Sequence, residues 1–334
     1  MAHPPDPGVA WLLASSDPAV RNLARTDLLG EPFDETAPLR SPRVQALLVA
    51  HRGHPYGNKW RGAHWRLVSL VELGVGAEPA VLDAVEQVLG WIATPGPRTT
   101  IADLERRHAS MEGNALAVCS RLGLAGDPRV VYLRDVLLAA QWPDGGWNCD
   151  RRPKARHSSF HESLATLWGL HEFNRATGDT EAGAAAERAE DFFLRHRLFR
   201  SEHSGRIADR EFIKLHYPPY WHYDILQAML VLSRRQSLDD QRCGDALDLL
   251  ESKRRPDGTW EPRGYRYWLR QGSERVNGDA VDWGRDGPNE MLTLNALRVL
   301  KAAGRAQWKR PSKRIGRHQD GSESRVARST PASS

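Results

Sequence analysis

The segment from Leu137 to Leu170, LLAAQWPDGGWNCDRRPKARHSSFHESLATLWGL, is the most informative part of the sequence about the architecture of the chain. It ends one predicted helix, passes through a Gly-rich turn that contains Trp147, and begins a second helix with polar residues. The Pro143-Asp144-Gly145 sequence is typical of a tight turn, because glycine readily adopts the positive φ that such turns need. The segment therefore predicts a helical hairpin unit, and much of the chain can be interpreted as repeats of it.

The Gly-rich turn occurs a second time with the same internal spacing. Its matching positions are Leu137 and Leu250, Gln141 and Arg254, Gly145 and Gly258, and Trp147 and Trp260. We expect each Trp to fold back onto the end of the preceding helix, and Gln141 to hydrogen-bond the free carbonyl groups there. This pattern favours a structural clasp between hairpins over a catalytic role.

Outside these turns the chain continues as helices in pairs. Asp17 is the expected N-cap of a helix that begins at Pro18 and ends at Gly30. Further helices are predicted over residues 41–50, 59–74, 79–91, 112–123, 127–141, 158–177, 181–197, 218–235, 238–252 and 288–303. No strand-like alternation is found, so the predicted fold class is all-α.

The predicted helices are of two kinds. One kind begins with polar and aromatic residues and is rich in small residues, and the other is more charged. Such alternation fits an open solenoid or a closed ring. Closure at six pairs fits the length, so we favour a single (α/α)6 toroid over residues 1–304, followed by a disordered basic and Ser-rich tail over 305–334.

Composition limits the classes of function. No apolar leader or long apolar run is present, which argues against a signal peptide or an integral membrane segment. The three cysteines, Cys119, Cys149 and Cys243, are far apart, which favours a reducing cytoplasm. The net charge of +5 comes from the tail, since residues 305–334 hold eight Lys/Arg and two Asp/Glu. The body is therefore not expected to bind nucleic acid, and the expected partner is a small molecule.

The first turn has a family resemblance. The sequence from Gln141 to Trp147, QWPDGGW, resembles the QW repeat of squalene–hopene cyclases and related terpenoid cyclases, and it is similar to the repeats of protein prenyltransferase β subunits. Those families share an (α/α)6 toroid with a central cavity. The resemblance covers roughly residues 10–304 and implies a protein that acts on or binds a mainly apolar small molecule there. The DxDD and DDxxD motifs of terpene cyclases are absent, and Val136 and Arg254 depart from the repeat.

A ring would bring the N-terminal ends of the polar-headed helices to one mouth. The expected substrate-binding residues at this mouth are His64, Trp65, Asn114, Phe160, Trp221 and Tyr223. The candidate catalytic residues are His161, Glu162, His222, Asp224 and Glu290. Carboxylates are also favoured in first helical turns by the helix dipole, and single His or Trp residues often only pack. Their repetition at equivalent positions supports a functional site.

Three chemistries fit these residues. Aromatic walls with a protonated acid, Asp150, Asp224 or Glu290, suit carbocation chemistry. Paired carboxylates among aromatic residues suit a carbohydrate-active enzyme. The resemblance to prenyltransferases implies a third option, zinc, for which Cys149, Asp150, His161 and His222 offer suitable ligands. A toroid that binds a ligand or partner without catalysis is a further alternative. No phosphate loop, Gly-x-Ser-x-Gly or His-Glu-x-x-His motif is found.

Overall fold

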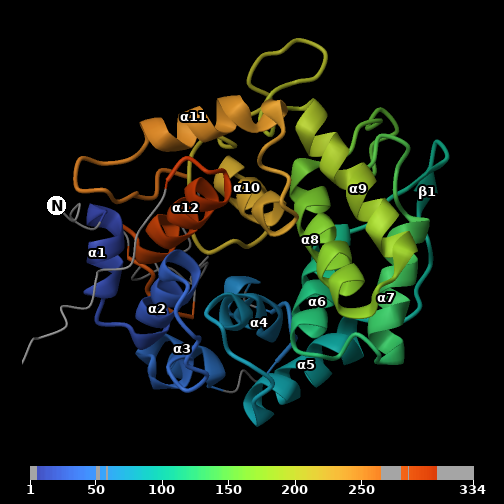
Figure 1. Cartoon of the computed structure of the whole chain (residues 1–334). Coiled ribbons are helices and arrows are strands. Elements are labelled where there is room, and N and C mark those ends of the chain that lie inside the picture. Colours follow the sequence, from blue (N-terminus) through green and yellow to red (C-terminus); the bar gives the residue numbers. More distant parts are fainter. Residues whose placement is uncertain (1–5, 50–52, 58, 265–279, 285, 307–334) are drawn as a thin grey trace, which may run out of the picture.

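The protein is described by a computed structural model that places residues 6–49, 53–57, 59–264, 280–284 and 286–306. This part of the chain is mainly helical (Figure 1). Its α-helices are α1 (Pro7–Leu13), α2 (Pro18–Leu23), α3 (Pro42–Leu48), α4 (Ala63–Glu72), α5 (Pro79–Ile92), α6 (Ala109–Arg121), α7 (Pro128–Ala139), α8 (Phe160–Thr177), α9 (Thr180–Arg195), α10 (Ile225–Arg234), α11 (Gly244–Ser252) and α12 (Glu290–Ala302).

The helices begin where the sequence provides an N-cap. Asp17, Ser41 and Asp127 each precede a proline and accept a hydrogen bond from a backbone N–H of the first helical turn. Asp179 and Asn289 cap α9 and α12 in the same way. The side-chain oxygen satisfies an N–H that has no partner within the helix, and the proline fixes a helical φ. These starts agree with the predicted ones to within two residues.

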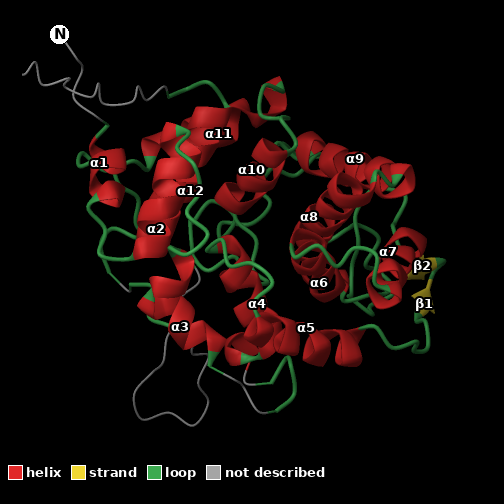
Figure 2. Cartoon of the chain, turned by 60° about the horizontal axis from the view of Figure 1, so that its bottom comes forward, coloured by secondary structure: helices red, strands yellow, loops and turns green. Residues whose placement is uncertain are grey.

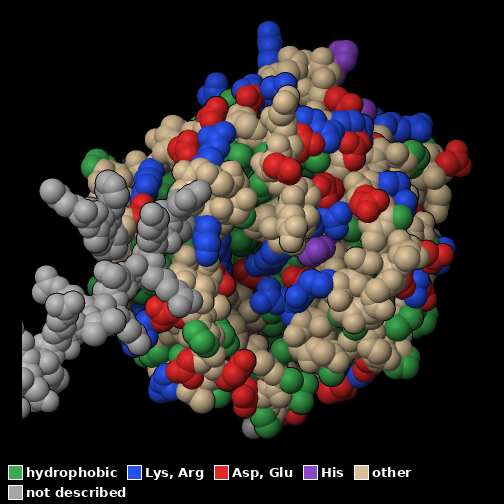
Figure 3. All heavy atoms as spheres, in the orientation of Figure 1, with side chains coloured by type: hydrophobic (Ala, Val, Ile, Leu, Met, Phe, Trp, Pro, Cys, Tyr) green, Lys and Arg blue, Asp and Glu red, His purple; other side chains and the backbone are tan. Residues whose placement is uncertain are grey.

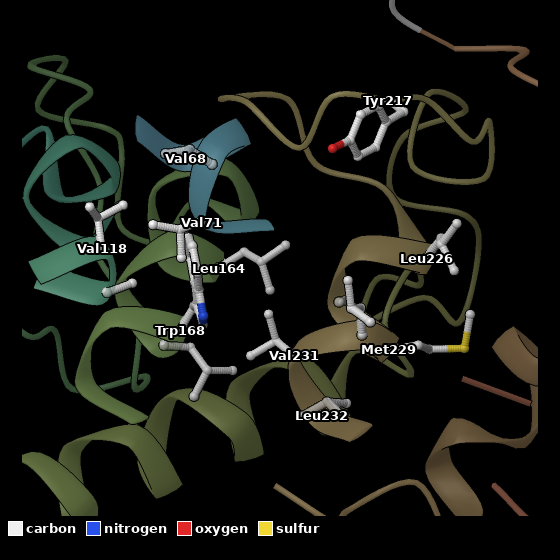
Figure 4. Packing of buried hydrophobic residues seen from close by; sticks show 14 of the residues in the cluster. Val68, Val71, Val118, Leu164, Trp168, Tyr217, Leu226, Met229, Val231 and Leu232 are labelled. Atoms are coloured by element: carbon white, nitrogen blue, oxygen red, sulfur yellow. The ribbon is translucent and has the colours of Figure 1, made fainter. Parts of the chain in front are cut away.

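The helices predicted to be polar-headed pack against one another in chain order. Helix α4 contacts α6, α6 contacts α8, α8 contacts α10, and α10 contacts α12, which also contacts α1 and α2. Figures 1 and 2 show α5, α7, α9 and α11 farther from the middle of the molecule than these helices. Buried Val, Leu and aromatic side chains fill the space between neighbouring helices, as among Val71, Trp168 and Val231 (Figure 4). The two helix kinds therefore lie in two different environments, and we call α4, α6, α8, α10 and α12 the inner helices.

Both Gly-rich turns are clasps. The indole Nε1 of Trp147 donates to the carbonyl of Leu137 at 2.8 Å, and that of Trp260 donates to Leu250 at 2.9 Å. Gly145 and Gly258 have positive φ values of 97° and 83°. Gln141 does not bond the end of its own helix, because Trp147 already does. Its amide instead donates to Gly145 within the turn and to Ala185 on α9.

Other predicted elements differ from the structure. Helix α10 begins at Ile225 rather than at residue 218, because Pro218 and Pro219 start an irregular segment and Asp224 is the N-cap. The prediction that the chain has no strands was wrong, since Thr100–Ile101 (β1) and Leu104–Glu105 (β2) pair as a short antiparallel hairpin. Almost all of the tail predicted to be disordered lies outside the described residues.

The described surface is mixed in charge. In the orientation of Figure 1, Lys and Arg side chains lie beside Asp and Glu side chains, and several of them surround a hollow near the middle of this face (Figure 3). None of the described helices has the length and apolar character required to cross a membrane.

Candidate functional site

Three potential metal ligands meet where α6 and α8 begin. His108 is the N-cap residue of α6, Cys149 follows the first Gly-rich turn, and Glu162 lies in the first turn of α8. One ligand atom from each of these residues lies within 4.8 Å of the others. Imidazole nitrogen, thiolate sulfur and carboxylate oxygen are all zinc ligands in proteins. We call His108, Cys149 and Glu162 the ligand triad.

Glu162 is the buried centre of the triad, with only 1% of its surface exposed. Its Oε2 accepts hydrogen bonds from the backbone N–H and the hydroxyl of Ser110, at 3.0 and 2.9 Å. Its Oε1 accepts from the indole of Trp221 at 2.9 Å and from the thiol of Cys149 at 3.4 Å. All four donors are neutral, and Glu162 forms no ion pair within the described residues. The carboxyl group of Glu162 is therefore buried without a direct cationic partner in the described part of the chain.

Close packing of α6 against α8 brings Ser110 to Glu162. A Cβ atom added at Gly113 would lie 2.6 Å from backbone atoms of Ala165, and one at Gly169 would lie 2.4 Å from the carbonyl oxygen of Gly113. Any larger side chain at either glycine would force the two helices apart. These two glycines therefore set the distance at which the start of α6 meets Glu162.

The thiol of Cys149 is protonated in this environment. Burial, together with the carboxylate of Glu162, raises its pKa to about 12. A metal cation would reverse this, because a coordinating thiol loses its proton to the metal. Glu162 is a buried carboxylate without a cationic partner among the described residues, and a thiol and an imidazole lie within reach of it, so the three groups fit a divalent metal ion.

An aromatic pocket lies beside the ligand triad. Its walls come from α4, α6, α8, α10 and the segment before α10, and they include Leu164, Trp168, Tyr220, Trp221, His222, Tyr223, Leu230 and Val231. Leu164, Trp168 and Val231 approach one another from α8 and α10 in Figure 4. Its free volume is about 50 Å³, so a ligand of more than a few atoms must displace side chains. Trp221 connects the two features, because it lines the pocket and donates to Glu162.

His161 and His222 line this pocket rather than joining the triad. The imidazole of His161 stacks on Trp221 with ring centroids 4.6 Å apart, and its Nδ1 accepts the backbone N–H of Tyr223. His222 lies 6.2 Å from His161 between ring centroids. Asp150 is also separate from the triad, because it turns outward to Arg152, and hydrogen bonds from Arg152 lower its pKa to about 2. Of the four predicted zinc ligands, only Cys149 belongs to the triad.

The predicted catalytic carboxylates have three separate sets of partners. Asp224 is fully buried and lies 2.6 Å from Nδ1 of His216, and it also caps α10. It is therefore an N-cap rather than a first-turn residue. Glu290 accepts hydrogen bonds from Ser15 and Arg43, near the N-terminal helices. Only Glu162 lies at the ligand triad.

The remaining predicted binding residues divide between pocket and core. Asn114 and Tyr223 line the aromatic pocket. Phe160 packs among the rings of α9 residues and Phe212 and does not line the pocket. His64 and Trp65 are buried in an aromatic cluster with Tyr56. Burial lowers the pKa of His64 to about 3, so its imidazole is neutral.

Sequence reasoning missed His108 and Ser110. The predicted helix began at residue 112, whereas α6 begins at Ala109, which brings both residues to the end that faces Glu162. The signal available in the sequence was His108-Ala109-Ser110, which precedes a run of small residues. No protein-family model, curated protein or solved structure matches this chain.

Proposed function

We propose that the chain is a zinc-binding α/α-toroid protein that acts on a mainly apolar small molecule in its central aromatic pocket. The observation that carries this proposal is the position of the ligand triad next to that pocket, with Trp221 contacting both. The in-order packing of the polar-headed helices and the two matching clasps support the (α/α)6 toroid. The toroid in turn supports the resemblance to terpenoid cyclases and prenyltransferases.

The ligand chemistry favours zinc among divalent metals. Calcium and magnesium prefer oxygen ligands, whereas a mixed set of imidazole, thiolate and carboxylate is typical of zinc. Three protein ligands leave a fourth position open for water or substrate, as in catalytic zinc sites. Zinc bound here would act as a Lewis acid toward a group on the small molecule or activate a bound nucleophile.

The chain's own residues suit an apolar ligand. Trp168, Tyr220 and Trp221 offer ring faces and apolar area, and Leu230 and Val231 add aliphatic surface to the same lining. Asn114 lines the same pocket and is only 2% exposed, and its amide nitrogen has no hydrogen-bond partner among the residues that the structure describes. An unpaired buried donor is unfavourable, so a ligand with one acceptor oxygen would fit better than a pure hydrocarbon.

The first test is the metal content of the purified full-length protein. We expect about one zinc per chain in the unaltered protein, and loss of most of it in Cys149→Ala and His108→Ala. Asp150→Asn, His161→Ala and His203→Ala are matched controls, because these side chains lie outside the triad and His203 is exposed. Loss of zinc in His161→Ala with retention in His108→Ala would transfer the site to the residues that the sequence alone suggested. Metal-free protein in all cases would refute the zinc proposal.

A further inference from the structure

A second and larger cavity lies at the opposite ends of the inner helices. Its volume is about 510 Å³, and it is lined where α4, α6 and α10 end and by Arg298 of α12. Pockets that hold small-molecule ligands commonly have about 300–1,000 Å³. The charged residues around this cavity are Asp27, Glu72, Arg121, Arg234 and Arg298. We call it the arginine cavity.

Two of the three arginines are fixed by carboxylates. Arg234 donates to both oxygens of Glu72, at 2.8 and 3.0 Å. Arg298 donates to Asp27 at 2.8 Å. These pairs hold two guanidinium groups in place at the cavity wall, and Arg298 also donates from Nη1 to Asn295. Because a guanidinium has five N–H donors, each of the two keeps N–H groups beyond those that bond other described residues.

Arg121 is different because no carboxylate holds it closely. Its nearest carboxylate oxygens, on Glu72 and Glu172, lie 3.6 and 4.0 Å away. Within the described residues its guanidinium has no hydrogen bond, and 28% of its side chain is exposed. Burial and the nearby charges of Arg234 and Arg298 lower the pKa of Arg121. Its guanidinium therefore has two carboxylates within ion-pair distance but no hydrogen-bond acceptor among the described residues.

Compensation of helix dipoles explains part of this arrangement. Arg121 and Arg234 lie in the last turns of α6 and α10, where a cation is favoured. That effect does not require the side chains of three helices to converge on one cavity. It also does not account for the guanidinium of Arg121, which has no hydrogen bond within the described part of the chain. Arg298 lies before the last turn of α12, whose basic residue there is Lys301.

We propose that the arginine cavity binds a small molecule through an oxyanion, a phosphate or a carboxylate, with Arg121 as its main ligand. The planar guanidinium presents paired N–H donors that match two oxygens of such a group. Arg234 and Arg298 stabilise the same anion from the sides. This site is separate from the ligand triad and does not depend on zinc. It adjoins the aromatic pocket, because Glu72, Leu230 and Arg234 line both cavities.

Calorimetric titration of the full-length protein tests this proposal, with inorganic phosphate and succinate as separate probes at constant ionic strength. We expect saturable binding of at least one probe with a Kd below about 1 mM. Binding of phosphate alone would assign a phosphate group, and binding of succinate alone would assign a carboxylate. No saturable binding of either probe at about 10 mM would overturn the proposal.

Variants locate the binding. Arg121→Gln should weaken binding about tenfold or more, and Arg121→Lys should weaken it less because the charge remains. Arg129→Gln is the matched control, since Arg129 pairs with Glu86 on the surface. Equal affinity in Arg121→Gln and the unaltered protein would overturn the assignment. Cys149→Ala should bind the probe normally, so failure of the zinc proposal and failure of this one are distinguishable. Circular dichroism of each variant confirms folding.

Discussion

The two Gly-rich turns share one framework. In the first copy the Trp147 indole donates to Leu137, and in the second the Trp260 indole donates to Leu250. The backbone N–H of each Trp donates to a hydroxyl group of the following inner helix, at 3.0 Å in both copies. The repeated residues therefore join the end of one helix to the beginning of the next inner helix.

The two copies differ immediately outside this framework. Two residues after the Trp, the first copy has Cys149 and the second has Pro262. Three residues after the N-cap of the next helix, the first copy has Glu162 and the second has Leu292. Two of the three potential metal ligands, Cys149 and Glu162, thus stand at positions where the second copy has residues whose side chains cannot bind a metal. What is repeated holds the hairpins together, and what is not repeated forms the candidate site.

The largest expected effect is on the shared framework. Trp147→Ala and Trp260→Ala should each lower the free energy of unfolding by about 3–5 kcal/mol, because both rings are fully buried and each loses a hydrogen bond. Urea unfolding followed by circular dichroism measures the change. Trp147→Phe and Trp260→Phe keep most of the ring contacts but leave a carbonyl without its donor, so about 1–3 kcal/mol is expected. If the Ala and Phe variants of one copy both leave the free energy of unfolding unchanged, the Trp of that copy does not hold its hairpins together.

The framework was also the part of the structure that the sequence predicted best. Turn glycines, N-caps and Asp-Pro or Ser-Pro pairs act within a few residues, so the sequence alone predicts where α2, α3, α7 and α9 begin. The start of α10 was wrong for the opposite reason. The aromatic residues before Asp224 are held by distant contacts, such as the hydroxyl of Tyr223 on the carbonyl of Leu198. Helical propensity does not report such contacts.

The candidate site could be predicted only in part for the same physical reason, because it depends on contacts between distant residues. Cys149 and Glu162 stand in the segment from Leu137 to Leu170, and both were predicted as site residues. His108 comes from a different hairpin, and its approach depends on how closely Gly113 and Gly169 let two helices pack. His161 and His222 have suitable ligand types, but their rings are engaged with the aromatic pocket.

A smaller effect is expected where the two copies contact different helices. In the first copy Gln141 accepts hydrogen bonds from Arg188 of α9, whereas in the second Arg254 donates to Asp6 beside α1. Gln141→Arg should place two guanidinium groups together and lower the unfolding free energy by about 1 kcal/mol, since Arg188 is exposed and solvent screens the repulsion. Thermal unfolding at low and high salt measures it.

The reciprocal change makes this test specific. Adding Arg188→Asp to Gln141→Arg rebuilds in the first copy the Arg–Asp pair of the second, and most of the lost stability should return. Arg188→Asp by itself removes the hydrogen bonds to Gln141 and serves as the control. The two single variants each change the unfolding free energy, and the sum of these changes predicts the stability of the double variant if the residues do not interact. If the double variant is no more stable than this sum, the contact between the turn and α9 does not determine which residue stands at position 141.

The smallest effect on stability is expected at the position that separates the copies. Glu162→Leu gives the first copy the residue that the second has at Leu292, and it removes a buried carboxylate that has no cationic partner within the described residues. The lost hydrogen bonds from Ser110 and Trp221 oppose the gain from relieving charge burial, so we expect the unfolding free energy to change by no more than about 1 kcal/mol in metal-free protein.

Zinc content should nevertheless fall from about one per chain to near zero. Glu162→Gln keeps one acceptor oxygen, for either Ser110 or Trp221 but not for both, so it should cost about 1–3 kcal/mol of unfolding free energy while binding zinc poorly. A loss of more than about 3 kcal/mol in both variants would make Glu162 part of the structural framework, because a residue that serves only a metal is not required for folding without it.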